Sequence, residues 1–242
     1  MNEATQTMLA PAGKMEVGLN DFELIKVLGK GGFGKVFLVI KKDEPDKPFA
    51  MKAIRKDIVI ETDMMESIKF EKSVLEKAQH PFLMNCTYIF KTENRFFFIM
   101  RFVQGGELFE HLRRANYFTE DIVRFMIAQM VLAIGHLHSD GIIYRDIKPE
   151  NILVDHDGYL CLCDYGLAKF LEEDESTETI VGTAEYMAPE ILRGMAYSFP
   201  VDWWAIGNLT YELITGRAPF SHNRANQMKQ DILNKPIRQK FV

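Results

Sequence analysis

The sequence predicts an α+β fold with two lobes, a small β-rich lobe followed by a larger lobe that is mainly helical. The chain has 242 residues, and because domains average about 150 residues, this length predicts one large domain or two lobes. Up to Gly105-Gly106, period-two apolar patterns separated by turn residues predict five strands and one main helix. Beyond these glycines the apolar residues follow helical spacing, so strands and helices are segregated as in α+β proteins.

Folded structure is predicted to begin near Asp21. Residues 1–20 show no sustained periodicity, so we expect a flexible leader there. The remaining residues 21–242 are predicted to form a small lobe over about 21–103 and a large lobe over about 104–242. The strands of the small lobe are predicted at residues 22–28, 35–40, 49–55, 86–90 and 95–103.

Helix signals occur at three places. Thr62-Asp63 is predicted to cap the main helix of the small lobe. In the large lobe, Thr119 precedes two acidic residues and an apolar face at helical spacing, and Gly141 ends this helix. A further helix over about residues 201–215 is apolar nearly all round, which predicts that it is buried.

Composition and charge exclude several classes of protein. Apolar residues make up 47% and charged residues 26% of the chain, which argues against disorder, collagen-like repeats and coiled coils. The net charge of −5 gives no global positive field, so nucleic acid and anionic membranes are not expected partners. The longest strongly apolar stretch, residues 126–137, is interrupted by Gln129 and is too short to cross a bilayer, so no membrane segment is expected.

The N-terminus and the cysteines predict an intracellular protein. Residues 1–5 lack the basic-then-apolar order of a signal peptide. Cys86, Cys161 and Cys163 are few and poorly spaced for a metal cluster, which suits a reducing compartment. We therefore expect the protein in the cytoplasm or the nucleus.

A glycine-rich segment follows the first predicted strand. Residues 29–36 read GKGGFGKV and match G-x-G-x-x-G-x-V, in which glycines let backbone amides approach phosphate oxygens. The same pattern is compatible with a tight hairpin turn that binds no ligand. A dinucleotide-binding fold and a Walker loop are disfavoured, because Lys35-Val36-Phe37 continues into a strand. The candidate nucleotide-binding residues of this segment are Gly29, Lys30, Gly31, Gly32, Phe33, Gly34 and Val36.

Lys52 lies within an apolar predicted strand. Burying an ammonium group without an anionic partner is costly, so Lys52 is predicted to contact anions. Glu71 on the following helix can supply one carboxylate, and a nucleotide phosphate can supply the rest. A single lysine of this kind can also lie at a strand edge with its ammonium group in solvent.

Three short segments follow in a set order: YRDIKPEN at residues 144–151, CDYG at residues 163–166 and APE at residues 188–190. In this order they resemble the H-R-D-x-K-x-x-N, D-F-G and A-P-E motifs of the eukaryotic protein kinases. GTAEYMAPE, which ends in this APE, and DWWAIG at residues 202–207 are similar to the AGC group, which holds the cyclic-nucleotide-dependent and Akt-like serine/threonine kinases. The resemblance covers about residues 17–220.

The resemblance implies a bilobal protein-kinase fold. The small lobe would be a five-stranded antiparallel sheet with one main helix. The large lobe would lack its last helices, because the family normally continues beyond Val242. Tyr165 departs from the family, which has phenylalanine in the second motif, and adds a hydroxyl that needs a partner if it is buried.

The resemblance also implies a role for each polar residue of the motifs. Asp146 would orient and deprotonate the substrate hydroxyl, while Lys148 would neutralise charge on the γ-phosphate and would favour serine or threonine as acceptor. Asn151 and Asp164 would hold Mg²⁺, a hard cation that prefers oxygen ligands. Each of these residues alone could instead serve a turn or a cap. The implied cofactors are ATP and Mg²⁺, and the implied catalytic residues are Asp146, Lys148, Lys52 and Glu71.

The adenine of ATP would lie among apolar residues of both lobes, beside the segment that connects them. These residues would be ordinary core in any fold. Glu107 resembles the family's ribose-contacting acid, whereas Arg101 stands where the family usually carries an acid. The implied contacts are Leu28, Val36, Ala50, Met100, Arg101, Val103, Glu107 and Leu153.

The resemblance further implies partners. Glu107, Glu150 and Glu212 match acidic positions that hold basic side chains upstream of the phosphoacceptor, although any single glutamate can be a solvated surface group. Protein substrates with serine or threonine in a basic context are therefore expected. We expect the chain to act as a monomer or with a regulatory subunit.

The segment between the second and third motifs should be an activation loop. Thr179 aligns with the family's regulatory phosphorylation site, so an upstream activating kinase is expected. A phosphate there could dock on Arg145 and Lys169. The acidic residues 172–178 also fit a solvated flexible loop. Thr183 resembles the residue that hydrogen-bonds the catalytic aspartate and lysine.

Two functions therefore stay open from the sequence. The first is an active ATP- and Mg²⁺-dependent serine/threonine protein kinase. The second is a truncated kinase-like binding or scaffold module with little or no phosphotransfer. The complete set of motif residues favours the first, and the missing C-terminal helices favour the second.

Overall fold

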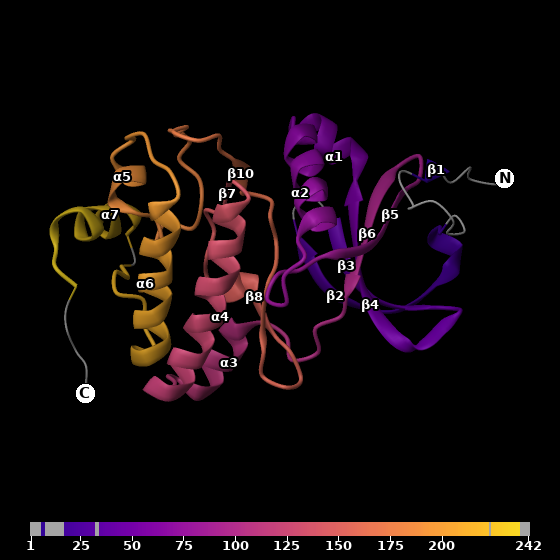
Figure 1. Cartoon of the computed structure of the whole chain (residues 1–242), viewed down its shortest axis with the longest axis horizontal. Coiled ribbons are helices and arrows are strands. Elements are labelled where there is room, and N and C mark those ends of the chain that lie inside the picture. Colours follow the sequence, from indigo (N-terminus) through magenta and orange to yellow (C-terminus); the bar gives the residue numbers. More distant parts are fainter. Residues whose placement is uncertain (1–5, 8–16, 32–33, 223, 238–242) are drawn as a thin grey trace. The chain divides into compact units, whose positions relative to one another are not determined.

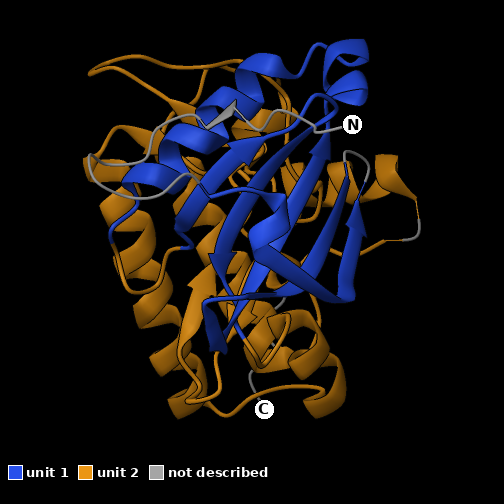
Figure 2. Cartoon of the chain, turned by 90° about the vertical axis from the view of Figure 1, so that its right-hand side faces the viewer, with its two compact units in different colours: residues 1–79, 84–103 blue, residues 80–83, 104–242 orange. Residues whose placement is uncertain are grey.

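The computed structural model describes residues 6–7, 17–31, 34–222 and 224–237. The chain forms two compact units, which Figure 2 colours separately. Unit 1 is Met1–Gln79 with Met84–Val103, and unit 2 is His80–Leu83 with Gln104–Val242. The predicted α+β class is confirmed, since unit 1 carries the large sheet and unit 2 is mainly helical (Figure 1).

Unit 1 is built on one antiparallel sheet with the strand order β1-β5-β6-β4-β3-β2. Five of its strands correspond to the predicted ones, and the additional strand β1 lies in the predicted leader. The third predicted strand begins earlier than expected, because Lys41 pairs with Glu44 across an irregular register. The strands are β1 (Gln6–Thr7), β2 (Phe22–Gly31), β3 (Gly34–Lys41), β4 (Glu44–Arg55), β5 (Cys86–Lys91) and β6 (Arg95–Arg101).

Two parts of the predicted leader make contacts within unit 1, and its flexibility stays a prediction. Gln6–Thr7 pairs with β5 through the main chain. Val17 and Leu19 pack on the buried cluster around Phe22, so burial of apolar surface holds this stretch in place. The expectation for residues 1–5 and 8–16 lies outside the described residues.

The described part of unit 1 has two α-helices where the sequence predicts one, α1 (Lys56–Glu61) and α2 (Met65–Lys77), besides the 3₁₀ turn η1 (Leu19–Asp21). The predicted cap is wrong, because the Thr62 hydroxyl donates to the Ile58 carbonyl at 2.7 Å and so belongs to the end of α1. Asp63 then turns the chain with a φ of 53°. The buried side chains of α2 are Ile68, Glu71, Val74 and Leu75.

The described part of unit 2 consists of helices and two short antiparallel strand pairs. The strand β7 (Ile142–Ile143) pairs with β10 (Lys169–Phe170), and β8 (Ile152–Val154) pairs with β9 (Leu160–Leu162). The helices α4 and α6 lie side by side (Figure 1). The helical elements are α3 (Leu108–Ala115), α4 (Glu120–Ser139), η2 (Pro149–Asn151), α5 (Pro189–Leu192), α6 (Pro200–Thr215) and α7 (Ala225–Asn234).

Helix α4 is longer than the apolar stretch predicted from the sequence. By length and composition alone it could cross a membrane, with a mean hydropathy of 1.3, a test that the core helix of a folded domain also passes. Seven of its side chains are buried within the chain, among them Met130 and Leu137. The buried Gln129 accepts the Leu160 N–H at 2.8 Å and donates to the Phe125 carbonyl, so its amide is satisfied inside the protein. These contacts make α4 a core helix of unit 2.

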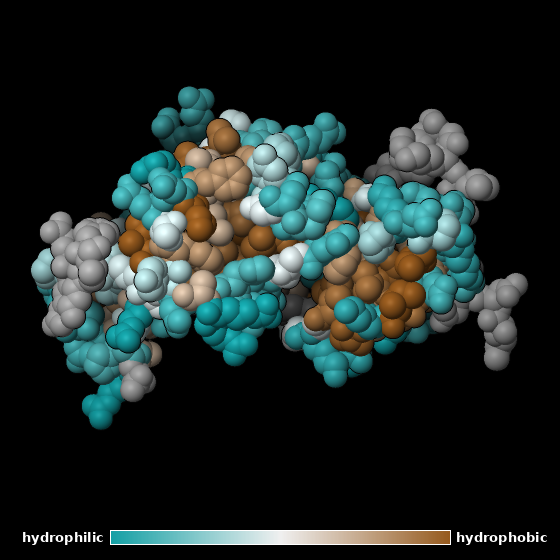
Figure 3. All heavy atoms as spheres, turned by 90° about the horizontal axis from the view of Figure 1, so that it is seen from below, coloured by the Kyte–Doolittle hydropathy of each residue, from teal (hydrophilic) through white to brown (hydrophobic). Residues whose placement is uncertain are grey.

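Apolar side chains also reach the surface of both units. Leu24, Val27 and Leu28 of β2 are partly exposed, as are Phe125 and Leu132 of α4. Figure 3 shows separate hydrophobic areas, divided by hydrophilic side chains, on the face that it presents. Because folded proteins keep much apolar surface, these residues do not by themselves define a binding site.

Candidate active site

A buried carboxylate fixes the chain that follows β7. Asp202 of α6 is 1% exposed. Its two oxygens accept the backbone N–H groups of Tyr144 and Arg145, each at 2.8 Å. His138 Nε2 lies 2.8 Å from the same carboxylate. Arg145 has a φ of 71°, so Asp202 supplies the hydrogen bonds that regular secondary structure would otherwise give this turn.

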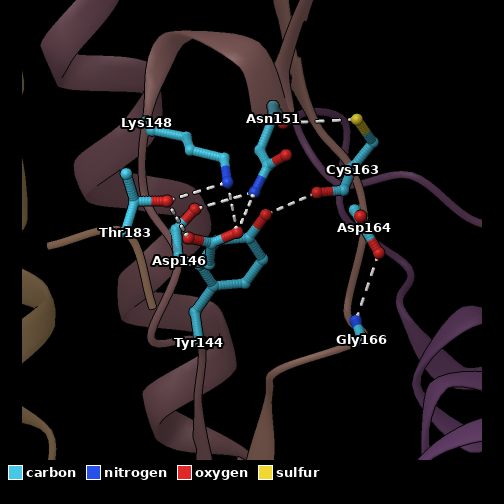
Figure 4. A network of polar contacts seen from close by, with 8 residues as sticks. All are labelled: Tyr144, Asp146, Lys148, Asn151, Cys163, Asp164, Gly166 and Thr183. Atoms are coloured by element: carbon cyan, nitrogen blue, oxygen red, sulfur yellow. Dashed lines mark hydrogen bonds and ion pairs between the residues drawn. The ribbon is translucent and has the colours of Figure 1, made fainter. Parts of the chain in front are cut away.

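The side chains after this turn form a closed polar network (Figure 4). One oxygen of Asp146 accepts the Thr183 hydroxyl at 2.8 Å. The other oxygen accepts the Asn151 amide and lies 2.8 Å from Lys148 Nζ. Lys148 also donates to Thr183 at 2.9 Å. Both oxygens of Asp146 are therefore held, and the ammonium group of Lys148 stands beside them.

Oxygen atoms suited to a hard cation lie at Asn151 and Asp164. The Asn151 amide nitrogen donates twice to Asp146, so its oxygen is the atom that a cation can use. The Asp164 side chain is exposed and accepts the Gly166 N–H at 3.2 Å, and its φ is 65°. A carboxylate and an amide oxygen are the donors that Mg²⁺ prefers, so the chemistry of this pair fits the ion.

Tyr144 connects the segment that carries Asn151 to the segment that carries Asp164. Its hydroxyl donates to the carbonyl of Cys163, the residue before Asp164 (Figure 4). Burial raises the pKa of Tyr144 far above its usual range, so the hydroxyl stays protonated and can donate. The ring meets that of Tyr165 edge-on at 6.1 Å, and Tyr165 is fully buried.

In unit 1, Lys52 and Glu71 form an ion pair. Lys52 lies on β4 and Glu71 on α2, and Lys52 Nζ is 2.5 Å from Glu71 Oε1. The carboxylate side chain is only 4% exposed, whereas the lysine is 25% exposed. The buried negative charge of Glu71 is therefore stabilised by Lys52, while part of the Lys52 side chain stays accessible to solvent.

The glycine-rich segment forms the hairpin of β2 and β3. Gly29 pairs with Val36 and Gly31 with Gly34. A side chain at Gly34 would collide with the Ala53 carbonyl, so glycine is required there for close backbone approach. Chain neighbours aside, no atom of the described residues lies within 4 Å of where a side chain at Gly29 or Gly31 would begin, so packing against the described part of the protein does not explain these two glycines. Gly32 and Phe33 lie outside the described residues.

The predicted adenine and ribose contacts are divided between the units. In unit 2, Glu107 and Leu153 are joined by a β-bridge. In unit 1, Ala50 pairs with Met100 across β4 and β6. The predicted contacts of unit 1 are Leu28, Val36, Ala50, Met100, Arg101 and Val103.

The predicted substrate-binding acids influence one another. The pKa of Glu107 is raised by burial and by the nearby charges of Glu150 and Glu110. The pKa of Glu212 is also raised, chiefly by burial and further by Glu150 and Glu185, although a hydrogen bond from the Tyr186 hydroxyl opposes this. These groups therefore form an acidic region of unit 2. A cationic ligand there would stabilise the charged carboxylates of Glu107 and Glu212.

The exposed side chain of Thr179 is not in contact with the two predicted phosphate ligands. Arg145 Nε donates to the Leu167 carbonyl at 2.6 Å. Lys169 Nζ lies 3.3 Å from a carboxylate oxygen of Glu175. Docking of a phosphate on these cations thus stays a prediction.

Sequence reasoning assigned no role to Asp202, Tyr197 or Glu175. A signal for Asp202 exists, because an acid within a nearly all-apolar helix must find buried donors. The hydroxyl contacts of Tyr197 have no such signal, since they depend on which backbone groups the fold brings beside the ring.

The sequence of this chain is similar to those of several known proteins. The protein kinase domain family matches residues 22–241. Protein kinase 2 of Dictyostelium discoideum is 45% identical over 232 residues, which cover 96% of this chain and 48% of that protein. The RAC family serine/threonine-protein kinase homolog of the same organism is 45% identical over 225 residues, 92% of this chain and 50% of that protein. Serine/threonine-protein kinase AtPK1/AtPK6 of Arabidopsis thaliana is 45% identical over 222 residues, 92% of this chain and 47% of that protein. The chain thus spans about half the length of these curated relatives.

Proposed function

The chain belongs to the protein kinase family, with AGC-type serine/threonine kinases as relatives, and we propose that it transfers the γ-phosphate of ATP to serine or threonine side chains of proteins. The observation that carries this proposal is the network in which Thr183, Asn151 and Lys148 hold both oxygens of Asp146. A carboxylate fixed in this way can receive a hydroxyl proton without reorganising.

Each residue of the network has a distinct task in this reaction. Asp146 orients the substrate hydroxyl and accepts its proton as the oxygen attacks the γ-phosphorus, whose bond to the bridging oxygen breaks so that ADP leaves. Lys148 places a positive charge beside the phosphoryl oxygens. The Thr183 hydroxyl is hydrogen-bonded to both Lys148 and Asp146 and so fixes their relative positions. Lys52, fixed by Glu71, supplies a second cation for the nucleotide phosphates.

Mg²⁺ is the proposed cofactor, and Asn151 and Asp164 would hold it. The ion neutralises charge on the phosphate oxygens when it is bound. The hydrogen bonds from Asn151 to Asp146 and from Gly166 to Asp164 orient the two oxygen ligands.

We propose basic residues upstream of the phosphoacceptor in the substrate. The support is the group of Glu107, Glu150 and Glu212. Burial and the nearby charge of Glu150 disfavour the charged carboxylates of Glu107 and Glu212 until a cation approaches. A guanidinium group pairs well with such carboxylates.

Two serine peptides test the function and the preference together. One carries arginines upstream of the serine, and the other has alanines in their place. With ATP and Mg²⁺, the full chain is expected to phosphorylate the first peptide with a kcat/KM at least about tenfold higher. Equal transfer to both would contradict the basic preference, and transfer to neither would favour a binding module without phosphotransfer.

The pH dependence of peptide binding follows from the raised pKa values. Glu107 and Glu212 take up protons at a higher pH than ordinary glutamates, so their attraction for a cationic peptide weakens as the pH falls through the raised values. The KM of the arginine peptide is therefore expected to rise as the pH is lowered from neutral towards the range in which carboxylates take up protons, more steeply than that of the alanine peptide. Steady-state kinetics over this range measure it, and parallel changes for both peptides would contradict the assignment.

Regulation and location complete the proposal. We propose that an upstream kinase phosphorylates Thr179, whose side chain is exposed. We also propose a cytoplasmic or nuclear location, supported by Cys86, Cys161 and Cys163, which are not joined by a disulfide and suit a reducing compartment.

A further inference from the structure

The segment that carries Thr179 is attached to the irregular segment just before α6. Thr177 and Tyr197 exchange both backbone hydrogen bonds, each at 2.9 Å. Thr177 is 5% exposed and Tyr197 is 4% exposed, so this bridge is buried although it joins two irregular segments. The chain next to Thr179 is therefore held by two backbone hydrogen bonds, and the Thr179 hydroxyl adds only a contact of 3.4 Å to the Thr177 hydroxyl.

The hydroxyl of Tyr197 links this segment to residues 144–151, which carry Asp146 and are called the catalytic loop below. It donates to the carbonyl of Thr179. At the same time it accepts a hydrogen bond from Arg145 Nη1, at 3.4 Å. Arg145 is the residue before Asp146, and its backbone N–H is fixed by Asp202. A chain of contacts thus runs from the Thr179 carbonyl through one hydroxyl to the residue beside the catalytic base.

A second contact holds the earlier part of the same segment. Glu175 accepts the backbone N–H of Glu172 at 3.0 Å with one oxygen, and the other oxygen is 3.3 Å from Lys169 Nζ. Both interactions lower the pKa of Glu175, the backbone hydrogen bond more than the lysine. Lys169 belongs to β10, whose partner β7 leads directly into the catalytic loop. The carboxylate of Glu175 thus gives Lys169 a negative partner within the segment itself.

We propose that Tyr197 is a positioning residue for phosphoryl transfer, whose hydroxyl holds the Thr179 main chain to Arg145 before any phosphate is added. The inference rests on the proposed kinase function for its catalytic consequence, but not for the attachment itself. It implies that the unphosphorylated enzyme keeps its activation segment ordered. A phosphate on Thr179 would then reinforce an existing attachment rather than create it.

The test replaces Tyr197 with phenylalanine, which keeps the ring and the backbone bridge and removes only the hydroxyl. Tyr159→Phe is the matched control, because the Tyr159 ring is 47% exposed and its hydroxyl makes no hydrogen bond among the described residues. Both variants and the wild type are prepared as the full chain without phosphate. A second set carries phosphothreonine at position 179, introduced during translation.

Hydrogen–deuterium exchange gives the readout that needs no catalysis. In Tyr197→Phe, amides of residues 174–182 are expected to exchange about three to ten times faster than in the wild type, the range that loss of one buried hydrogen bond predicts. Amides of α6 should be unchanged, which shows that unit 2 is folded. Exchange in residues 174–182 equal to that of Tyr159→Phe would overturn the proposal.

Kinetics give the readout that a merely structural role would not move. In the unphosphorylated enzyme, Tyr197→Phe is expected to lower kcat about fivefold with the KM for ATP unchanged. With phosphothreonine at position 179 the loss should shrink below about twofold, because the phosphate anchors Arg145 by charge-assisted hydrogen bonds. An equal loss in both forms would overturn the positioning role. If the exchange result holds but no form of the chain transfers phosphate, the attachment stands and the proposed function fails.

Discussion

Phosphate transfer by the Lys52→Met variant is expected to fall at least about 100-fold below that of the wild-type chain, because the cation that we propose for the nucleotide phosphates is lost. The substitution also leaves Glu71, which is 4% exposed, without its cationic partner. The free energy of unfolding should fall by about 2 kcal/mol for this reason. Kinetics with the arginine peptide and urea unfolding measure the two effects.

The double variant Lys52→Met with Glu71→Gln separates these effects. A neutral amide at position 71 no longer needs a cation, so a large part of the lost stability is expected to return. Phosphate transfer should stay low, because no cation is restored. Recovery of transfer together with stability would show that Lys52 acts only through folding.

The largest loss of stability is expected from Asp202→Ala. This change removes the acceptor of the Tyr144 and Arg145 backbone N–H groups, which are then left without their hydrogen-bond partner inside unit 2. Each unsatisfied buried donor costs about 1–3 kcal/mol, so the free energy of unfolding should fall by about 3–5 kcal/mol. Asp202→Asn keeps an acceptor oxygen and should lose about half as much.

Tryptophan fluorescence can follow this loss within unit 2, since the two tryptophans of the chain, Trp203 and Trp204, both lie on α6. Urea unfolding of the wild type, both Asp202 variants and the control Asp121→Ala gives the comparison. Asp121 is exposed at the start of α4, so its loss should cost less than about 0.5 kcal/mol. A loss in Asp202→Ala as small as that of the control would contradict the anchoring role.

Local patterns predicted most of the fold. Alternating apolar residues located β2, β3, β5 and β6, and helical spacing with a glycine stop located α4. The predictions differ from the structure where contacts with residues outside the local pattern determine the conformation. Phe22 and its neighbours hold Val17 and Leu19 in place, although the sequence there has no periodicity.

The candidate site could be predicted where its residues lie in one short motif. Asp146, Lys148 and Asn151 lie within six positions of sequence, so their spacing carries the signal. Asp202 contacts backbone groups 57 and 58 positions away, and Tyr197 contacts a carbonyl 18 positions away. Contacts of this kind depend on tertiary packing. A local pattern can indicate that Asp202 needs buried donors, but it does not show which backbone groups supply them.

Asp146 is proposed to act as the base in phosphate transfer from ATP. The most direct measurement incubates the full chain with γ-labelled ATP, Mg²⁺ and the arginine peptide, beside the Asp146→Asn variant at equal ATP occupancy. The wild type is expected to label the peptide, and Asp146→Asn to do so at least about 100-fold more slowly, since asparagine keeps the shape of the side chain but cannot take the proton. Equal rates in the two proteins, or no label from a wild type that binds ATP, would contradict the claim.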